Sequence, residues 1–294
     1  MESDSSPVAQ FIRRDGRRPT EIRGKELRLS ELPQFGGSSV YAQGGTTVLV
    51  AVHGPSASGM QEGGGGSNYY CRDQDRCEVV IRINPTSFPA AGGAQRVIQQ
   101  ERRRAEMGEK YAVFVSQLCL NAVHCAFMAE RFPKMCLSLD LIVLQDGGSL
   151  AAVCVNAVMA ALLDSGLPCR TTIAAVCLAE VEGQLRQGKT VETKTSYWLD
   201  PTVEEEDSLF EEINDLHPSQ SGTSYGPLQT VSTSVCVFAN PNSGGGLVAY
   251  HQRPVKAPLT PAHGASDRTA VLELAEKACH VIFDTFRCCN VPLE

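Results

Sequence analysis

A glycine-rich turn is the most informative site for chemistry in this sequence. Residues 141–144 form a short apolar run that predicts a buried strand, and the sequence Asp-Gly-Gly-Ser follows at 146–149, ahead of an alanine-rich segment. Glycines let the backbone approach a ligand closely, and the unpaired N–H groups of a first helical turn attract anions. We therefore expect Gly147, Gly148 and Ser149 to bind a phosphate group, although turns of this kind are common and the motif alone is not specific.

Three consecutive arginines are a second candidate for contact with phosphate. Arg102, Arg103 and Arg104 lie at or near the start of a helix that the apolar spacing predicts over 95–128. Consecutive residues point to different sides of a helix, so at most two of these side chains can contact one ligand. The pattern is equally consistent with a contact to the RNA backbone and with a solvated first turn.

Carboxylates near residue 200 form the third group. Asp200 follows the apolar end of a predicted strand, and an acidic run occupies 204–215 without a Lys or Arg. Carboxylate pairs can hold Mg²⁺ or act as general acids, whereas a run of adjacent carboxylates is more often a solvated loop. Asp200 is the better candidate, because its position would desolvate and fix the side chain. The histidines are scattered and no Cys-x-x-Cys pair occurs, so we expect no metal site and no cofactor.

An excess of positive charge marks residues 13–28. A solvated basic arm is the favoured interpretation, and the alternatives are an edge that contacts phosphate or an arm that docks on an acidic partner surface. The basic residues of this arm are Arg13, Arg14, Arg17, Arg18, Arg23, Lys25 and Arg28.

Composition excludes several classes of protein. The net charge of −7 argues against indiscriminate nucleic-acid binding, and we expect no DNA partner. No apolar run reaches membrane-spanning length and the polar start lacks a secretory pattern, so we expect a soluble protein without a membrane partner. Half of the 12 cysteines lie in apolar runs, where free Cys behaves as a small hydrophobe, and this indicates a reduced intracellular protein. Those residues are Cys119, Cys125, Cys154, Cys177, Cys236 and Cys279.

Periodicity places these groups on an α+β framework of two similar strand–helix halves packed as one domain. The strand over 46–52 should end at Gly54-Pro55, and the strand over 136–144, the helix over 149–165 and the strand over 171–181 should form one strand–helix–strand unit of a parallel or mixed sheet. The sequence pattern over 182–196 predicts a hairpin or an exposed loop. The remaining expected elements are strands over 78–83, 232–239 and 247–251 and a helix over 267–287, and the expected irregular segments are a disordered 1–10, a glycine-rich insertion at 56–70 and an acidic and polar linker at 204–227.

Four motifs in this order resemble the RNase PH family over residues 11–287. They are the basic turn Asp15–Pro19, the segment Gly37–Pro55, the turn Gln145–Ser149 with its helix, and Leu199–Thr202 ahead of the acidic run. The resemblance implies an RNase PH core, related to the second domain of ribosomal protein S5, over 11–290. Members of the family assemble as six-membered rings around a channel for single-stranded RNA, and active members are phosphorolytic 3′→5′ exoribonucleases that release nucleoside diphosphates.

The sequence departs from active members at the phosphate site. Their glycine turn is typically followed by Gly-Thr-Arg or Gly-Ser-Arg, whose Arg holds the phosphate, whereas the apolar Leu150 follows Gly148-Ser149 here. The family also uses two Asp residues six apart, and counting from Asp200 leads to Glu206, with Asp207 one step beyond. These three carboxylates are therefore interpreted as vestiges of a catalytic pair, and no catalytic residue is expected.

The resemblance favours a scaffold. The turn with its Leu-Ala-Ala continuation, together with Trp-Leu-Asp-Pro-Thr at 198–202, is most similar to the Mtr-type (mRNA transport) ring subunits of the eukaryotic exosome. This implies a non-catalytic member of a hetero-hexameric ring with other RNase PH-like subunits, S1/KH-domain cap proteins, a separate hydrolytic nuclease and single-stranded RNA, in the nucleus, nucleolus and cytoplasm. The alternatives are an active phosphorolytic exoribonuclease in which another Arg replaces the lost one, and a homo-oligomer with no RNA role.

Overall fold

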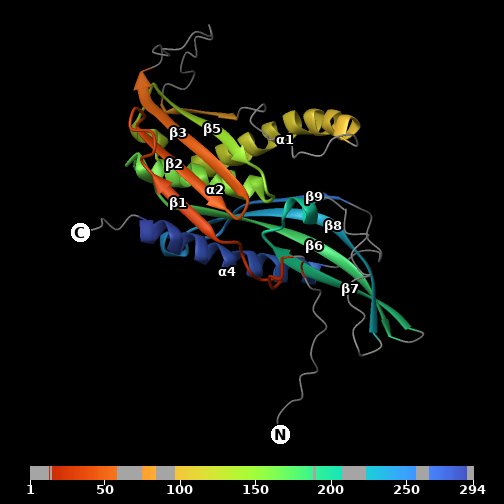
Figure 1. The fold of residues 1–294 in the computed structure, drawn as a ribbon. Coiled ribbons are helices and arrows are strands. Elements are labelled where there is room, and N and C mark those ends of the chain that lie inside the picture. Colours follow the sequence, from red (N-terminus) through yellow and green to blue (C-terminus); the bar gives the residue numbers. More distant parts are fainter. Residues whose placement is uncertain are drawn as a thin grey trace.

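Two β-sheets and the helices packed on them make up the structure, a computed structural model (Figure 1). It describes residues 13, 15–57, 75–83, 97–187, 190–206, 223–255 and 265–289. The predicted disordered start at 1–10, nearly all of the glycine-rich insertion at 56–70, and residues 207–222 of the predicted linker lie outside this part of the chain.

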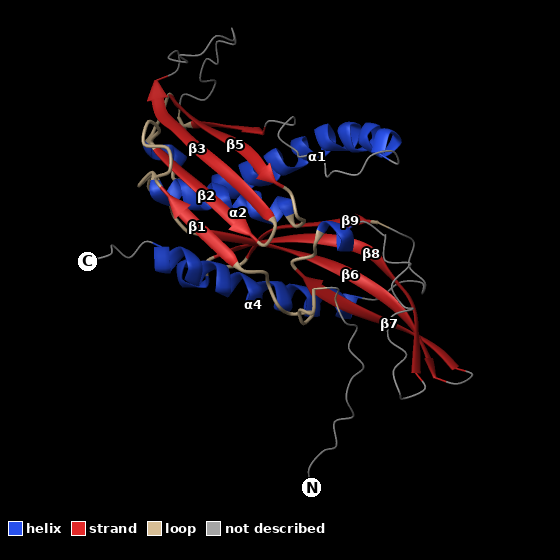
Figure 2. Ribbon diagram, in the orientation of Figure 1, coloured by secondary structure: helices blue, strands red, loops and turns tan. Residues whose placement is uncertain are grey.

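The first sheet has the strand order β1-β2-β3-β5-β4, and only the β4–β5 pair is parallel (Figure 2). Its strands are β1 (Lys25–Leu29), β2 (Gly37–Gln43), β3 (Thr46–Ala57), β4 (Glu78–Ile83) and β5 (Met135–Gln145). The second sheet is antiparallel throughout, with the order β7-β6-β8-β9. Its strands are β6 (Ile173–Gln187), β7 (Thr190–Leu199), β8 (Thr223–Ala239) and β9 (Leu247–Pro254).

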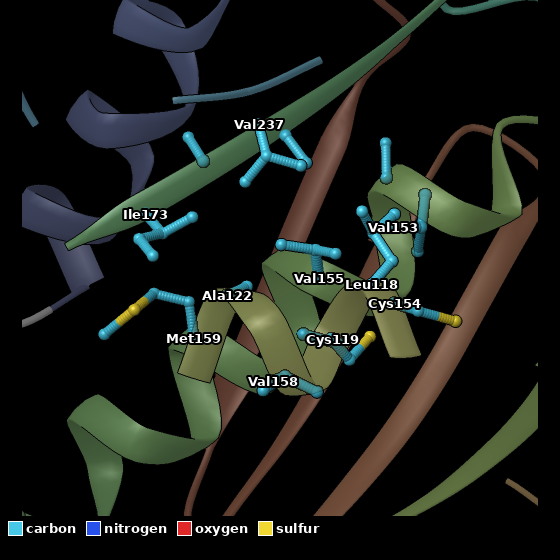
Figure 3. Packing of buried hydrophobic residues seen from close by; sticks show 14 of the residues in the cluster. Leu118, Cys119, Ala122, Val153, Cys154, Val155, Val158, Met159, Ile173 and Val237 are labelled. Atoms are coloured by element: carbon cyan, nitrogen blue, oxygen red, sulfur yellow. The ribbon is translucent and has the colours of Figure 1, made fainter. Parts of the chain in front are cut away.

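The helices are α1 (Val97–Ala126), α2 (Leu150–Asp164), the single turn α3 (Val203–Glu206) and α4 (Ala265–Cys289), with short 3-10 turns at Ala129–Arg131 and Pro241–Ser243. Helix α2 contacts β2 and β3 on one side and β6 on the other, so it lies between the two sheets. Every residue from Leu150 to Leu162 is buried, and all are apolar except Asn156, whose amide forms two hydrogen bonds with the backbone of Ala175 in β6. In Figure 3, Val155, Val158 and Met159 of α2 pack near Leu118, Cys119 and Ala122 of α1 and Ile173 of β6.

Two expectations about strands are wrong. The strand predicted to stop at Gly54-Pro55 continues to Ala57, because a register shift between His53 and Ser56 absorbs the pair and pairing with β5 then resumes. The predicted strand–helix–strand unit does not form within one sheet. Strands β5 and β6 belong to different sheets, since the fully buried α2 between them needs an apolar surface on both sides.

Other predicted elements agree with the structure, with shifted ends. Residues 182–196 belong to the β6–β7 hairpin, and the acidic linker is shorter than expected because α3 occupies 203–206 and β8 begins at Thr223. All described cysteines are free thiols and most are buried as expected, but Cys125 is exposed. No described helix is long and apolar enough to cross a membrane.

Candidate phosphate and RNA site

The glycines of the turn are required for packing between chain segments. A Cβ on Gly147 would lie 2.7 Å from the backbone carbonyl carbon of Gly45, in the turn between β2 and β3. Gly148 has φ +101°, and a Cβ there would lie 2.5 Å from the carbonyl oxygen of Pro201. Three distant backbone segments therefore meet at this turn, and the space that a ligand would need at the two glycines is filled by the chain itself.

The chain also supplies an anion to the N-terminus of α2. The backbone N–H of Ser149, the residue before the helix, donates to Oε1 of Glu206 at 2.8 Å, and its hydroxyl donates to the carbonyl oxygen of Pro201 at 2.9 Å. The N–H of Gly148 donates to Oδ1 of Asp146 at 3.1 Å. A carboxylate at a helix N-terminus takes the place that a phosphate oxygen would use, because both are stabilised by the same N–H groups and helix dipole.

Glu206 has an unusual protonation equilibrium. Its pKa is raised to about 7, chiefly by burial and also by the charge of Asp146, while the Ser149 N–H and the positive charges of Arg253 and Arg23 oppose this rise. Near pH 7, Glu206 therefore alternates between a neutral and a charged form at the helix N-terminus.

We expect the replacement Glu206→Gln to flatten the pH dependence of stability. The folded-state pKa of Glu206 lies above the unfolded value, so ionising the carboxyl costs stability as pH rises from about 4.5 through 7. Because the side chain is half-buried, we expect the variant to gain on the order of 1–2 kcal/mol over the parent at pH 8 relative to pH 5. Urea unfolding at both pH values measures the difference, and parallel pH profiles of the two proteins would contradict it.

Asp200 is held by Arg23. The carboxylate accepts from the Arg23 backbone N–H at 2.9 Å, from Nε at 2.8 Å and from the second guanidinium nitrogen at 2.7 Å. The same guanidinium donates to the carbonyl oxygens of Gly147 at 2.7 Å and Gly148 at 3.0 Å. Burial alone would raise the pKa of Asp200, but the hydrogen bonds and charge of Arg23 outweigh it and hold the pKa below its usual value. Asp200 is thus a buried, paired anion rather than a proton donor.

A second buried pair fastens the basic arm. Arg13 donates to the two carboxylate oxygens of Glu205 at 3.0 and 2.6 Å and to the carbonyl oxygen of Leu199 at 2.7 Å, and its guanidinium lies 5.5 Å from the ring centre of Trp198. Arg13 and Glu205 are both fully buried. The interpretation of a solvated arm is therefore wrong for Arg13 and Arg23. These two arginines pair with buried carboxylates of the same chain, Glu205 and Asp200.

The structure brings together five of the predicted site residues, namely Gly147, Gly148, Ser149, Asp200 and Glu206. The prediction of a solvated acidic loop holds for the exposed Glu204 but is wrong for Glu205, because Arg13 compensates its burial. Leu150 is buried in the core and presents no cation to the turn.

The structure describes no side-chain contacts for the remaining predicted site residues. Arg102, Arg103 and Arg104 lie within α1, as expected, but their side chains are outside the described part of the chain, as is Asp207. No cluster of three His, Cys, Asp or Glu suited to a metal ion occurs among the described residues.

Comparison with known proteins identifies the class. Residues 21–168 match the model of the 3′ exoribonuclease family, domain 1, known as RNase PH, and this chain belongs to that family.

Two relatives by sequence carry exosome names. A putative exosome complex component RRP41 of Caenorhabditis briggsae is 32% identical over 171 residues, 58% of this chain and 64% of the relative. The exosome complex component RRP41 of Homo sapiens is 30% identical over 174 residues, 59% of this chain and 64% of the relative. The aligned region thus spans just under two thirds of the length of these relatives.

Solved structures agree on the fold across nearly the whole chain. Rice Rrp46 aligns with a TM-score of 0.60 at 21% identity, covering 94% of this chain and 98% of Rrp46. An Archaeoglobus fulgidus exosome with RNA bound to the active site aligns with a TM-score of 0.57 at 16% identity, covering 94% and 92%. The α+β RNase PH fold expected from the motifs is therefore confirmed.

Proposed function

We propose that this chain is a non-catalytic ring subunit of an RNA exosome, acting in 3′→5′ RNA processing and decay such as rRNA maturation and mRNA turnover. The observation that carries the proposal is the state of the anion site. The carboxylate of Glu206 caps α2 where a phosphate would bind, and Asp200 is neutralised by Arg23.

Phosphorolysis places two anions, inorganic phosphate and the scissile phosphodiester, side by side. An active site for this reaction needs cations and N–H groups aimed at the developing charge, and the loss of one such group typically costs about 3–4 kcal/mol. In this chain the Glu206 carboxyl group accepts from the Ser149 N–H, and the side chain at position 150 is an apolar residue in the core. Both features oppose the binding of phosphate.

The exosome names of the sequence relatives support the assignment to a hetero-hexameric ring of RNase PH-like subunits. In this proposal the ring carries S1/KH-domain cap proteins and guides single-stranded RNA to a separate hydrolytic nuclease in the nucleus, nucleolus and cytoplasm. Within the ring we assign the chain to the Mtr-type position, on the strength of the Gly148-Ser149-Leu150 and 198–202 motifs, although the relatives above carry the RRP41 name. Mass spectrometry of the native complex tests this: recovery of only copies of this chain would overturn it.

We expect no phosphorolysis from this subunit. Purified chain and reconstituted ring are incubated with single-stranded RNA and inorganic phosphate, and released nucleoside diphosphates are measured by chromatography. The expected result is no release above that of a ring carrying Asp200→Asn, a change that removes the carboxylate charge and suits the positive φ of this position. Nucleoside diphosphate release that disappears in the Asp200→Asn ring would contradict the proposal.

One observation favours the alternative of an active phosphorolytic enzyme. Arg253 carries a positive charge that lowers the pKa of Glu206, and unlike Arg23 its guanidinium is not engaged by Asp200, so Arg253 is the candidate to stand in for the missing arginine. Release of nucleoside diphosphates that depends on Arg253 would establish this alternative.

A further inference from the structure

An aromatic and cationic cluster lies where α1 passes β9 (Figure 1). The rings of Phe114 and His251 are 4.3 Å apart between centres, with an interplanar angle of 38°. Tyr111 lies one helical turn before Phe114, with its ring centre 5.9 Å away, and the Arg253 guanidinium lies 5.8 Å from the ring centre of Tyr111. We refer to Tyr111, Phe114, His251 and Arg253 as the α1–β9 cluster.

Strand alternation explains why these side chains meet. His251 and Arg253 are two residues apart on β9 and therefore share one face, which is turned towards α1. The intervening Gln252 belongs to the other face, where its amide nitrogen donates to the hydroxyl of Ser232 at 2.9 Å. Phe114 and Tyr111 are half-buried and hold the cluster to α1, whereas His251 is exposed.

Arg253 differs from the arginines of the basic arm. Arg13 and Arg23 use their guanidinium nitrogens in buried pairs with Glu205 and Asp200. Within the part of the chain that the structure describes, the side chain of Arg253 makes no hydrogen bond or ion pair, and its guanidinium contacts the ring of Tyr111. A guanidinium that rests on an aromatic ring keeps its planar fork of N–H donors available for a phosphate.

The cluster adjoins the candidate site. The charge of Arg253 lowers the pKa of Glu206, and the charge of Glu206 raises the pKa of Tyr111, so these side chains lie within electrostatic range of one another. The cluster therefore lies near Glu206, the residue that accepts from the Ser149 N–H at the N-terminus of α2.

We propose that the α1–β9 cluster binds one nucleotide of single-stranded RNA, with the phosphate on Arg253 and the base stacked on the exposed His251, which Phe114 supports. This deepens the proposed function and rests on it. A stacking surface next to a cation is the general means by which single-stranded RNA is bound without sequence preference, since every base has a π-face. An acidic peptide would use the cation but would not need the ring pair.

The test uses the full chain in a reconstituted ring and measures the binding of a fluorescent single-stranded RNA by anisotropy over a range of salt concentrations. We expect Arg253→Gln to weaken binding by about five- to tenfold and to reduce the salt slope by about one, because one phosphate contact is lost. We expect His251→Ala to weaken binding by a similar factor and leave the salt slope unchanged.

Two substitutions serve as matched controls. Arg170→Gln removes an exposed arginine whose partner is Glu130, and His280→Ala removes an exposed histidine that lies beside Phe283 on α4. Neither control should change RNA affinity. Thermal unfolding of every variant shows that the fold is retained, and if Arg253→Gln unfolds, Arg253→Lys provides the second test, since lysine keeps the charge but loses the planar fork.

The outcomes separate this inference from the proposed function. Unchanged RNA affinity in both Arg253→Gln and His251→Ala overturns the inference and leaves the scaffold role standing. If millimolar inorganic phosphate weakens RNA binding by the parent ring as much as the substitutions do, Arg253 binds free phosphate, and the proposal of an RNA site is overturned. Release of nucleoside diphosphates by the parent ring that disappears in the Asp200→Asn ring overturns the non-catalytic role, whatever the binding data show.

Discussion

Replacement of Arg23 by methionine should lower the free energy of unfolding by about 3–5 kcal/mol. Methionine retains much of the apolar stem but leaves the carboxylate of Asp200 buried without its partner, and it frees the carbonyl oxygens of Gly147 and Gly148. Arg17 lies 3.8 Å from Asp200 and cannot restore these bonds. Chemical unfolding followed by circular dichroism measures the loss.

The change Arg28→Met is the matched control. Arg28 lies five residues after Arg23, on β1. Its exposed guanidinium pairs with the carboxylates of Glu26 and Glu31. Exposed pairs contribute little, so this variant should stay within about 0.5 kcal/mol of the parent. The double variant Arg23→Met with Asp200→Asn should regain part of the loss, because no unpaired charge remains. Equal stability of the single and double variants would argue that the buried charge is not the cause.

The second large effect is expected from Gly148→Ala, which should cost about 3–5 kcal/mol. The φ of +101° is unfavourable for any residue with a Cβ, and the new methyl group would lie 2.5 Å from backbone atoms of Pro201, Thr202 and Val203. Since these atoms belong to the backbone, no side chain can turn away to relieve the contact. We expect the variant to separate α3 from the α2 N-terminus and to weaken the Ser149 to Glu206 hydrogen bond.

Gly166→Ala distinguishes strain from steric contact. Gly166 also has a positive φ, +65°, but no atom lies within 4 Å of the position of its Cβ. This control should therefore cost only the conformational penalty of about 1–2 kcal/mol. Similar losses at positions 148 and 166 would show that packing around the turn contributes little.

Secondary structure was largely predictable because its signals are local. The apolar helix after the glycine turn and the amphipathic α4 follow from spacing alone, and their boundaries shift by only a few residues in the structure. Sheet membership was not predictable in the same way. The pairing of β6 depends on where α2, which is apolar on nearly every side, is buried, and in this chain α2 lies between the two sheets.

The candidate site shows the same division between local and distant signals. The glycine turn and Asp200 were recognisable from their flanking residues, but the arginines that pair with Asp200 and Glu205 were expected to be solvated. No spacing rule links Arg23 to Asp200, because 177 residues separate them and only the tertiary fold joins them. The burial of Glu205 has the same cause, since a run of adjacent carboxylates carries no mark of which member will be enclosed.

The proximity of the four α1–β9 cluster side chains could not be predicted from sequence patterns either. Tyr111 and Phe114 lie in the helix predicted over 95–128 and His251 ends the strand predicted over 247–251, whereas no element was predicted at Arg253. Their proximity arises where α1 meets β9, which depends on the packing of α1 against α2 and on the pairing of β9 with β8 in the second sheet.

The pairing of Arg13 with Glu205 sets an order of events during synthesis of the chain. Arg13 leaves the ribosome long before its partner, which follows 192 residues later. Until then Arg13 lacks Glu205, the carboxylate that compensates its burial. The Arg13–Glu205 pair therefore forms only once residue 205 has been synthesised. In a truncated product that ends before residue 205, Arg13 lacks this partner, and the start of the chain is accessible to proteases and to RNA in the cell.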